Sequence, residues 1–403
     1  MMVNPNKVRD VESDYVLQVY KRLPVVFVRG KGASLYDAGG KDYIDLLSGL
    51  GVASLGHAYP ALTKAIASQA SELLHTSNLF FHPLQGRVAK KLAQLSGLQK
   101  TFFTNSGTEA VEACLKFARR HWYSKGQSSR TGIVTFNRSF HGRTFGSLSV
   151  TSGSSYREPF TPLVPDVTFV SPDEPSSLLS AVSENTAAII VEPIQGEGGV
   201  WPLSSATVET LRSLCAKTGS LLIADEVQCG LGRTGQAFHS ARLGLKPDLM
   251  ALGKALGGGV PVGAAMMSEN IAQTINFGDH GSTYGGNLLA CRAALVFLEE
   301  LENGLMNRVR ESGEHLETGL RALANRYSSI VQIRGSGLMW GIEVLEPIVE
   351  RIVPIALDKG LIVNRTANNV IRLLPPLNIS EDELDTGLTR LEIAFRIAAS
   401  ETS

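Results

Sequence analysis

The chain lacks an excess of either charge. Its lysines and arginines number 38 and its acidic residues also number 38, in 403 residues, so no field of one sign favours nucleic acid or an acidic membrane. No apolar run approaches the roughly 20 residues that a membrane-spanning helix needs. The N-terminal residues also lack the apolar stretch of a signal peptide. We therefore expect a cytoplasmic protein that binds neither nucleic acid nor membrane.

Cysteine is scarce as well. The four cysteines are widely scattered and form no C-x-x-C pair, which predicts reduced thiols in place of a disulfide framework: they are Cys114, Cys215, Cys229 and Cys291. Histidine appears in no H-E-x-x-H motif and in no Cys/His cluster. We therefore expect no metal site.

Short apolar runs separated by helix-length stretches occupy the middle of the chain. Because these runs are apolar on both faces, they predict a mostly parallel sheet covered by helices on both sides. The candidate strands are 101–104, 132–136, 167–170, 187–191, 221–224, 249–252 and 262–267. After the first of them, apolar residues at helical spacing predict the buried side of a helix.

The two ends of the chain follow a different pattern. Residues 34–45 resemble a hairpin with its turn at Gly39-Gly40. The C-terminal third alternates helices with candidate strands at 330–333, 338–343, 361–363 and 370–373. We expect a large α/β domain over 59–290. A smaller α+β domain would combine the N-terminal segment 1–58 with residues 291–403.

The segment Asn105-Ser-Gly-Thr-Glu109 follows the first candidate strand and opens the helix after it. Ser106 and Glu109 have the spacing of a capping box, which satisfies free amide groups at a helix start. Gly107 would equally let an anion approach those amides at the positive end of the helix. The residues alone leave a structural cap and a phosphate site as equal alternatives.

A second glycine-rich segment, Gly230-Leu-Gly-Arg-Thr-Gly235, matches the G-x-G-x-x-G pattern of dinucleotide-binding folds. That pattern requires a full helix directly afterwards. The stretch 236–243 is short and ends at Gly244. We therefore expect a surface loop here in preference to a nicotinamide site.

Lys254 stands among small residues in Ala251-Leu-Gly-Lys-Ala-Leu-Gly-Gly-Gly259, and Asp225 ends an apolar run about thirty residues earlier. A lysine amine condenses with aldehydes, so it can hold a carbonyl cofactor as a Schiff base. An aspartate at a strand's end can face the far side of the same cofactor. Each residue also has an ordinary alternative, a solvated charge for the lysine and a turn for the aspartate. The surrounding motifs decide between them.

Ordered phrases over nearly the whole chain resemble the class III, fold-type I pyridoxal-phosphate aminotransferases. These phrases are Leu55-Gly-His-Ala-Tyr-Pro60, Asn105-Ser-Gly-Thr-Glu109, Ser139-Phe-His-Gly-Arg-Thr144, Val191-Glu-Pro-Ile-Gln-Gly-Glu197, Ala224-Asp-Glu-Val-Gln228, Lys254-Ala-Leu-Gly-Gly-Gly259, His280-Gly-Ser-Thr-Tyr-Gly-Gly-Asn287 and Ile371-Arg-Leu-Leu-Pro-Pro-Leu377. The resemblance implies an α/β fold whose large domain holds a seven-stranded, mostly parallel sheet. It also implies pyridoxal 5'-phosphate as the cofactor.

By this resemblance Lys254 and Asp225 are the catalytic residues. Lys254 would carry the cofactor as a Schiff base and move protons once the substrate displaces it. Asp225 would keep the pyridine nitrogen protonated, so that the ring can absorb electrons. Gln228 would lie near the phenolic oxygen, and Glu192 would support the site from behind.

The same resemblance implies the contacts to the rest of the cofactor. Ser106, Gly107 and Thr108 would hold its phosphate. Ser282 and Thr283 match phosphate contacts that family members take from the neighbouring subunit, which implies a homodimer with shared active sites. Phe140 and Val227 would cover the two ring faces, although either could equally be a plain core residue.

Two arginines match the substrate-binding positions of the family. Arg143 would bind the α-carboxylate of an ornithine-type donor, because a guanidinium fork holds a carboxylate with direction. Glu197 would pair with Arg372 during that half-reaction and swing away when 2-oxoglutarate enters. Tyr20 would assist at the pocket mouth. A non-catalytic protein on the same fold is disfavoured because the whole set is intact.

Within the class, the chain is most similar to members that act on N2-acetyl-L-ornithine in arginine biosynthesis, notably in 84–97, 244–249 and 369–380. Those members transfer an amino group to 2-oxoglutarate and yield N-acetyl-L-glutamate 5-semialdehyde and L-glutamate. Leu50 stands where ornithine aminotransferases carry tyrosine, which suits an acylated donor. Ornithine, succinylornithine and 4-aminobutyrate are the alternative donors.

Three positions depart from the family pattern. Leu288 replaces a proline after Asn287, which predicts a looser start of the next helix. Ser54 replaces asparagine and leaves the choice of donor less certain. Gly253 replaces alanine before the lysine. None of these changes removes a catalytic group.

Overall fold

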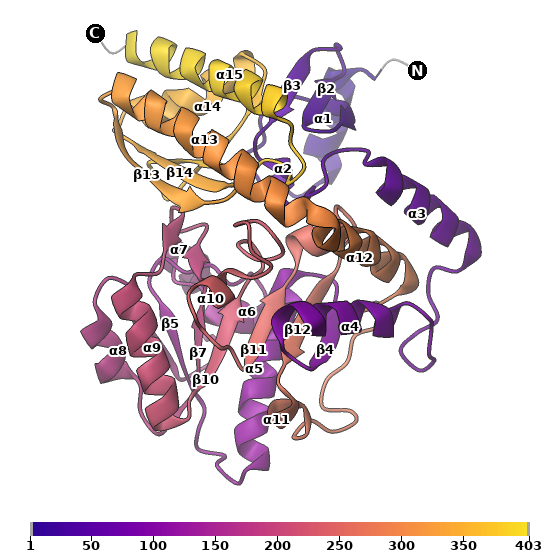
Figure 1. The fold of residues 1–403 in the computed structure, drawn as a ribbon, viewed down its shortest axis with the longest axis vertical. Coiled ribbons are helices and arrows are strands. Elements are labelled where there is room, and N and C mark those ends of the chain that lie inside the picture. Colours follow the sequence, from indigo (N-terminus) through magenta and orange to yellow (C-terminus); the bar gives the residue numbers. More distant parts are fainter. Residues whose placement is uncertain (1–2, 401–403) are drawn as a thin grey trace.

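The computed structural model describes residues 3–400. It consists of one layer built on a seven-stranded sheet and a second layer built on two four-stranded sheets (Figure 1). None of the described helices combines the length and apolarity needed to cross a membrane.

The seven-stranded sheet forms the centre of the first layer. Its strands in spatial order are β4 (Lys100–Thr104), β12 (Gly263–Met267), β11 (Leu249–Leu252), β10 (Leu221–Asp225), β7 (Thr186–Val191), β5 (Gly132–Phe136) and β6 (Val167–Val170). Neighbouring strands are parallel except at β12, which runs antiparallel to both β4 and β11. All seven predicted strands and the predicted fold class are thereby confirmed.

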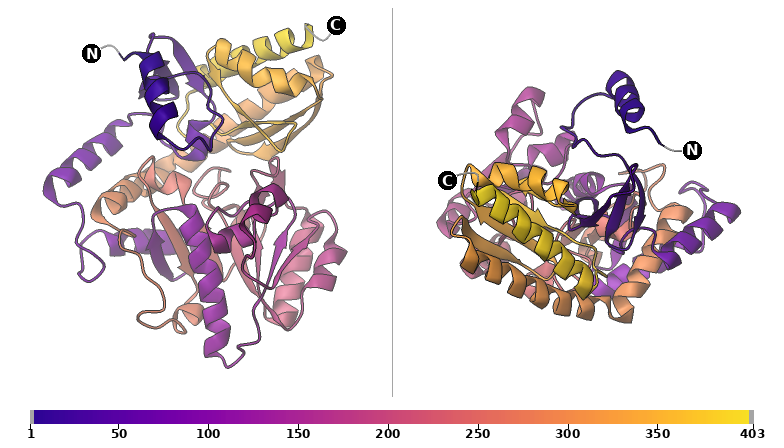
Figure 2. Two further views of the ribbon diagram at one scale, coloured as in Figure 1. Left: turned by 180° about the vertical axis from the view of Figure 1, so that it is seen from behind. Right: turned by 90° about the horizontal axis from the view of Figure 1, so that it is seen from above.

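Helices cover both faces of this sheet because its strands are apolar on both sides. On β7, Ala188 and Ile190 pack in the cluster of α5 (Gly107–Ser124). The alternate residues Ile189 and Val191 pack in the opposite cluster, which contains side chains of α8 (Pro175–Ala181) and α9 (Ser205–Thr218). Seen from behind, α5 crosses in front of the strands (Figure 2). Its N-terminus follows β4 directly and therefore lies at one edge of the site described below.

Short elements complete this layer. They are α4 (Gln85–Ser96), α6 (Phe145–Ser149), α7 (Ser154–Arg157), η1 (Glu158–Phe160), β8 (Ile194–Gln195), β9 (Trp201–Pro202), α10 (His239–Arg242), η2 (Lys254–Gly257) and α11 (Glu269–Ala272). The single turn η2 begins at the candidate lysine.

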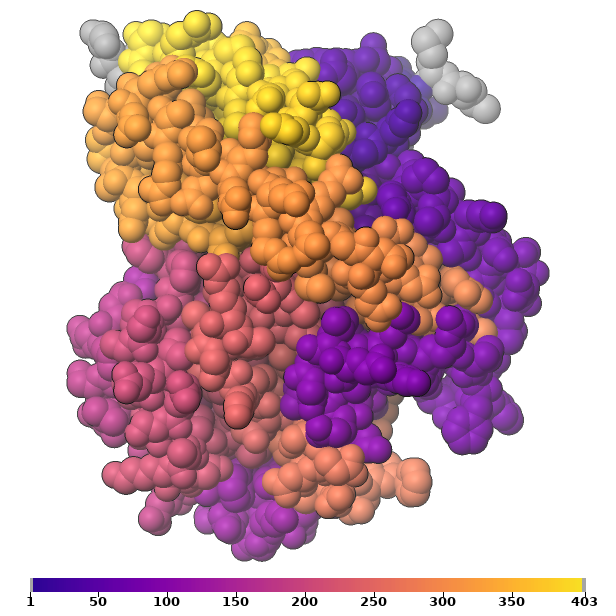
Figure 3. All heavy atoms as spheres, in the orientation of Figure 1, coloured from indigo at the N-terminus to yellow at the C-terminus, as the bar shows by residue number. Residues whose placement is uncertain are grey.

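The second layer joins the two ends of the chain. β1 (Phe27–Lys31), β2 (Ser34–Asp37) and β3 (Asp42–Asp45) form an antiparallel meander, which confirms the predicted hairpin. β3 also pairs in parallel with β15 (Leu361–Ile362). The N-terminal and C-terminal segments accordingly lie side by side at the top of Figure 3. The domain boundaries near 58 and 290 stay predictions.

The other sheet of this layer is entirely antiparallel. Its order is β13 (Ile330–Ser336), β14 (Met339–Val344), β17 (Val370–Leu373) and β16 (Asn364–Thr366). The sequence did not predict β16, because Asn-Arg-Thr has no apolar side chain to mark a strand. The strand matters because it lies beside Arg372 on β17.

Eight further helical segments connect and cover the sheets. They are α1 (Pro5–Tyr15), α2 (Ser48–Gly51), α3 (Pro60–Glu72), α12 (Leu288–Glu300), the π-helical η3 (Leu301–Leu305), α13 (Met306–Arg326), α14 (Ile348–Asp358) and α15 (Glu381–Ser400). The looser start of α12 stays a prediction. The Asn287 side chain accepts a hydrogen bond from the Ala290 amide at 3.0 Å and so caps this helix.

The expectation of a surface loop at 230–235 is also wrong. The segment is buried, and Arg233 is only 1% exposed. Its guanidinium donates to the carbonyls of Leu338 and Pro375 at 3.0 and 2.5 Å. The loop therefore joins the two layers. The helix after it, α10, has only four residues, consistent with the rejection of a dinucleotide site.

Candidate functional site

A cavity of about 240 Å³ lies at the carboxyl ends of β10 and β7 and the N-terminus of α5. It brings together residues that are far apart in the sequence. Most of the residues that line it were predicted from the sequence to belong to the site. They are Gly107, Thr108, Phe140, Arg143, Glu192, Glu197, Asp225, Val227, Gln228 and Lys254. In open α/β sheets this is the edge where ligands bind.

Lys254 enters the cavity from the turn after β11. Its φ is +36°, in the left-handed region that residues other than glycine seldom adopt. Such strain persists only where the surrounding structure enforces it, and it is common at functional sites. Burial lowers the pKa of the ammonium group. No hydrogen bond or ion pair engages this group among the described residues, so the amine is available to react.

Asp225 lies at the end of β10 and is fixed from two sides. Its Oδ1 accepts the Val227 amide at 3.0 Å, and its Oδ2 lies 2.7 Å from His141 Nδ1. Both side chains are nearly completely buried. His141 Nε2 has no hydrogen-bond partner in the part of the chain that the structure describes. The carboxylate is therefore held in one orientation at the wall of the cavity.

Close backbone approaches shape the wall between the lysine and α5. A Cβ at Gly107 would meet Val227 Cγ1 at 2.6 Å, and one at Gly253 would meet the Gly107 amide nitrogen at 3.0 Å. This contact explains why residue 253 is glycine, because an alanine there would press on the start of α5. Ser54 is fully buried and donates to the Ala255 carbonyl at 3.0 Å, so it supports the lysine turn.

Arg143 lies at the rim of the cavity and is exposed. Its guanidinium carbon lies 3.7 Å from the centre of the Tyr156 ring and 5.5 Å from that of Phe140. No carboxylate of the described residues pairs with it. The rings orient the guanidinium while its hydrogen-bond donors stay free.

Arg372 lies behind the cavity wall and is fully buried. Its Nη1 donates to Glu197 Oε1 at 2.6 Å and to Gln228 Oε1 at 3.3 Å. Burial raises the pKa of the Glu197 carboxyl, but the charge and hydrogen bond of Arg372 outweigh it and the net shift is downward. The structure thus contains the predicted Glu197–Arg372 pair, with the carboxylate ionised at neutral pH.

Glu192 is buried at the back of the site. Its oxygens accept the amides of Phe140 at 2.9 Å and Gly196 at 3.1 Å. Burial raises the pKa of this carboxyl to about 7. The side chain therefore joins two loops that line the cavity, the one that carries Phe140 and the one that carries Glu197.

Besides Arg372, four predicted residues are not among those that line the cavity. The Ser106 hydroxyl accepts the Glu109 amide at 3.3 Å, and so caps α5. Ser282 Oγ accepts the Gly285 amide at 2.9 Å, and Thr283 is exposed. Tyr20 is 73% exposed. The roles predicted for these four side chains stay predictions.

One contact and one residue of the site could not be predicted from the sequence. His141, a histidine beside glycine in a loop, suits a turn or pocket-lining role, and it does line the cavity, but nothing in the sequence indicated its contact with Asp225. Tyr156 gave no signal at all, because nothing in the sequence places it against Arg143. Only folding brings α7 to that rim.

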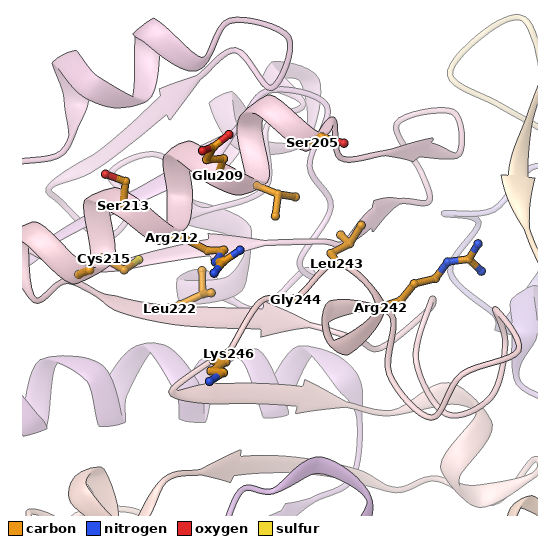
Figure 4. Close-up of a pocket in the computed structure, with 12 residues that line it drawn as sticks. Ser205, Glu209, Arg212, Ser213, Cys215, Leu222, Arg242, Leu243, Gly244 and Lys246 are labelled. Atoms are coloured by element: carbon orange, nitrogen blue, oxygen red, sulfur yellow. The ribbon is translucent and has the colours of Figure 1, made fainter.

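A larger cavity, of about 850 Å³, lies between α9 and residues 242–246 (Figure 4). It contains exposed charged side chains such as Arg212 and Lys246 beside apolar residues of α9. Arg242 extends away from the others in Figure 4 and donates to Ser336 Oγ. No buried reactive lysine or paired carboxylate lines it, so the smaller cavity is the candidate active site.

The sheet order and the lysine turn after β11 define the class: the fold is that of fold-type I transferases. The family model described as aminotransferase class-III matches residues 15–395. The chain belongs to the class-III aminotransferases, a family that depends on pyridoxal phosphate.

Individual relatives agree with this assignment. The acetylornithine aminotransferase of Aquifex aeolicus is 46% identical over 94% of this chain and 98% of its own length. That of Methanocaldococcus jannaschii is 44% identical over 96% and 97%. A solved ornithine aminotransferase from Toxoplasma gondii, described with partial occupancy of pyridoxal phosphate at its active site, superposes with a TM-score of 0.94. It is 32% identical, with 99% and 96% of the two chains covered.

Proposed function

We propose that this protein transfers the amino group of N2-acetyl-L-ornithine to 2-oxoglutarate, giving N-acetyl-L-glutamate 5-semialdehyde and L-glutamate in arginine biosynthesis. Near-full-length similarity to acetylornithine aminotransferases from two distant organisms supports this choice of donor. The observation that carries the reaction class is the cavity that joins Lys254, Asp225 and a free rim arginine.

The cavity fits pyridoxal 5'-phosphate. The first amides of α5 at Gly107 and Thr108 have no intrahelical partner and can hold a phosphate. Phe140 and Val227 lie in the lining, where they can cover the ring faces, and Gln228 can reach a phenolic oxygen. When bound, the cofactor supplies a carbonyl that takes up the amino group and a ring that withdraws electrons.

The chain's own groups then handle protons and charge. Asp225, which His141 and the Val227 amide orient, presents a carboxylate to a protonated ring nitrogen. The Lys254 amine would take a proton from the substrate carbon that bears the nitrogen and deliver it to the carbon that had been the cofactor's carbonyl carbon. A pKa lowered by burial favours this role, because an amine that is partly neutral can accept a proton.

The two arginines bind the carboxylates of the two substrates in different combinations. Arg143 binds the single carboxylate of the donor while Glu197 neutralises Arg372. With 2-oxoglutarate, Glu197 moves away, Arg372 binds the α-carboxylate and Arg143 holds the distal one. Leu50 supports an acylated donor because its apolar side chain offers no hydrogen bond to a free amino group. It lies in the turn whose Ser48 hydroxyl bonds Leu374, two residues beyond Arg372.

A homodimer completes the proposal. Apolar side chains are strongly exposed on two segments, Leu79, Phe80 and Phe81 on one and Phe277 and Tyr284 on the other. Asn78 donates to the carbonyls of Ser282 and Gly285, so the segments lie side by side. Exposed apolar surface of this kind marks an interface. A second copy placed there would bring its own Ser282 and Thr283 to this site.

The experiment that tests the function compares amino donors with 2-oxoglutarate. N-acetylornithine should give the highest kcat/KM, ahead of succinylornithine, ornithine and 4-aminobutyrate. A higher value for ornithine or 4-aminobutyrate would overturn the proposed donor. Lys254→Ala should abolish both turnover and the borohydride-sensitive absorbance of the purified protein. Lys246→Ala, at an exposed lysine outside the site, is the matched control and should change neither.

A further inference from the structure

Strand β16 carries two polar side chains toward the arginine–glutamate pair. Asn364 lies opposite Arg372 in the antiparallel register, and Thr366 lies opposite Val370. Side chains two apart on a strand share a face, as do directly opposed residues of neighbouring strands. Asn364, Thr366 and Arg372 therefore occupy one face of the β16–β17 hairpin, and Glu197 packs against it.

Asn364 holds the arginine itself. Its Oδ1 accepts Arg372 Nε at 3.3 Å, on the edge of the guanidinium that Glu197 does not occupy. Gln228 accepts a further bond from Nη1. Gln228 also donates to Glu197 Oε1 at 3.5 Å, whereas Asn364 has no hydrogen bond to Glu197 among the described residues. Asn364 therefore still holds the guanidinium when the carboxylate leaves.

Thr366 holds the glutamate. Its Oγ1 donates to the Glu197 main-chain carbonyl at 2.7 Å and also lies 3.4 Å from Glu197 Oε2. The side chain is buried, with 8% of the residue exposed. Since the hydroxyl has one proton, the shorter bond to the carbonyl is the main one. It fixes the point from which the Glu197 side chain must swing.

Other hydrogen bonds fix the two ends of the loop around Glu197. The Gly196 amide donates to Glu192 Oε2 at 3.1 Å, and the Gly199 carbonyl accepts Arg334 Nε at 2.8 Å. Glu197 itself lies between glycines, which leave a main chain the most conformational freedom. Among the described residues Thr366 is the hydrogen-bond partner of the Glu197 carbonyl, and it lies on the strand that neighbours the arginine.

We propose that Thr366 is a positioning residue that stabilises the closed Glu197–Arg372 pair and so sets how readily the site admits a dicarboxylate. This inference rests on one part of the proposed function, namely that Arg372 binds the second carboxylate of a dicarboxylate ligand. A ligand that needs Arg372 binds only the open fraction of the protein, so its apparent affinity falls as the closed state is stabilised. A ligand with one carboxylate, held by Arg143, does not experience this competition.

The test measures equilibrium binding of two ligands of equal chain length, glutarate with two carboxylates and valerate with one. Thr366→Val removes the hydroxyl at nearly constant volume, and Thr366→Ser retains it. Loss of one neutral hydrogen bond is worth a factor of roughly 2 to 12. We expect Thr366→Val to lower the Kd of glutarate about fivefold while that of valerate stays constant. Thr366→Ser should behave as the wild type.

A double-mutant cycle separates this role from general loosening. In a Glu197→Ala background, Thr366→Val should leave the glutarate Kd unchanged, because the carboxylate that it positions is gone. An unchanged glutarate Kd in the single Thr366→Val variant overturns the proposal. The proposal is also overturned if Thr366→Val changes the Kd of valerate as much as that of glutarate. The same holds if Thr366→Val has its full effect on the glutarate Kd in the Glu197→Ala background. Thr366→Ala gives the same readouts if the valine variant does not fold.

The outcome is independent of which amine the enzyme prefers. If the donor comparison overturned acetylornithine, the glutarate and valerate measurements would still decide the role of Thr366. With the preferred donor, whichever it is, Thr366→Val should also lower KM for 2-oxoglutarate while the donor's own binding is unaffected. A uniform fall in kcat for both half-reactions would instead indicate a merely structural role.

Discussion

The two arginines of the site are held in opposite ways. Arg143 is exposed, rests on the Tyr156 ring at 3.7 Å and has no carboxylate partner in the described chain. Arg372 is fully buried and bonded to Glu197, Gln228 and Asn364. Buried charges need partners, whereas rim charges remain solvated without them. In the proposed function, Arg143 would therefore be open to a carboxylate at all times, and Arg372 would be open to one only after Glu197 moves.

The difference explains how the proposed enzyme could accept substrates with different numbers of carboxylates. A free second arginine would bind any dicarboxylate and exclude donors with one carboxylate by leaving a charge unpaired. In the proposed function, Glu197 would supply the missing charge for the donor and withdraw for the acceptor. Variants at either arginine, or at the side chains that hold them, test this contrast.

The largest effect should come from Arg372→Ala. Truncating one partner of a buried, hydrogen-bonded charge pair costs roughly 2–5 kcal/mol, so kcat/KM for 2-oxoglutarate should fall roughly 30-fold or more. The donor half-reaction should change much less. Single-turnover rates of the two half-reactions measure this split. Arg372→Lys, which keeps the charge without the planar fork, should recover only part of the loss. Equal losses of rate in both half-reactions would contradict the proposal that Arg372 binds a substrate carboxylate only in the 2-oxoglutarate half-reaction.

Arg143→Ala should lower kcat/KM roughly 10- to 100-fold in both half-reactions, because each loses a charge-assisted hydrogen bond. The free energy of unfolding should stay within about 0.5 kcal/mol of the wild type, since the side chain is exposed and unpaired. Steady-state kinetics and urea denaturation check the two parts. A loss confined to 2-oxoglutarate would show that Arg143 does not receive the donor carboxylate.

Tyr156→Leu should have a smaller effect through Arg143. Removing the ring removes a cation–π contact worth about 0.5–1 kcal/mol at an exposed site, so KM for both substrates should rise roughly 2- to 5-fold with little change in kcat. Tyr156→Phe keeps the ring and is the matched control. If Tyr156→Leu and Tyr156→Phe change KM equally, the hydroxyl or general packing of Tyr156 supports Arg143, and the ring face does not.

The smallest effect should be on the free energy of unfolding at acidic pH, measured with Glu197→Gln. The pKa of the Glu197 carboxyl is lowered in the folded protein, mainly because Arg372 outweighs the effect of burial. A depressed pKa contributes stability that is present above the ordinary carboxyl value of 4.5 and is lost as the pH falls through the folded value. The difference in unfolding free energy between the wild type and Glu197→Gln should be constant from about pH 9 to pH 5. It should shrink below that range.

Its size should be about 1 kcal/mol or less, because the Glu197 side chain is 34% exposed and solvent weakens the pair. Urea denaturation at several pH values measures it. A difference that instead grows on acidification would mean that Glu197 is protonated at neutral pH and does not neutralise Arg372.

Much of the fold could be predicted because its causes are local. Seven apolar runs, each flanked by helix-length stretches, were enough to place every strand of the large sheet. The hairpin at Gly39-Gly40 followed from its turn residues. Prediction failed where the cause is tertiary. The 230–235 loop looks like a solvated turn, yet Arg233 is buried because two carbonyls of the other layer accept its hydrogen bonds.

The same division holds for the candidate site. The motifs pointed to Lys254, Asp225, Arg143, Glu197 and Arg372, and the structure collects four of them around one cavity with Arg372 behind it. The contacts of His141 with Asp225 and of Tyr156 with Arg143 had no sequence signal, because each joins separate elements. The roles of Ser282 and Thr283 stay predictions that depend on a second subunit, and the role of Tyr20 at the pocket mouth stays a prediction as well.

The amino-acid sequence specifies the chemical groups of this protein: a lysine that can react with a carbonyl, a carboxylate at a strand end and two arginines. Its composition and periodicity also specify the sheet that carries them, since apolar burial drives strand and helix formation. That one arginine is free and the other occupied follows from the folded arrangement. The reason is burial: a charge at the rim is solvated by water, whereas the buried one on β17 must be paired with Glu197.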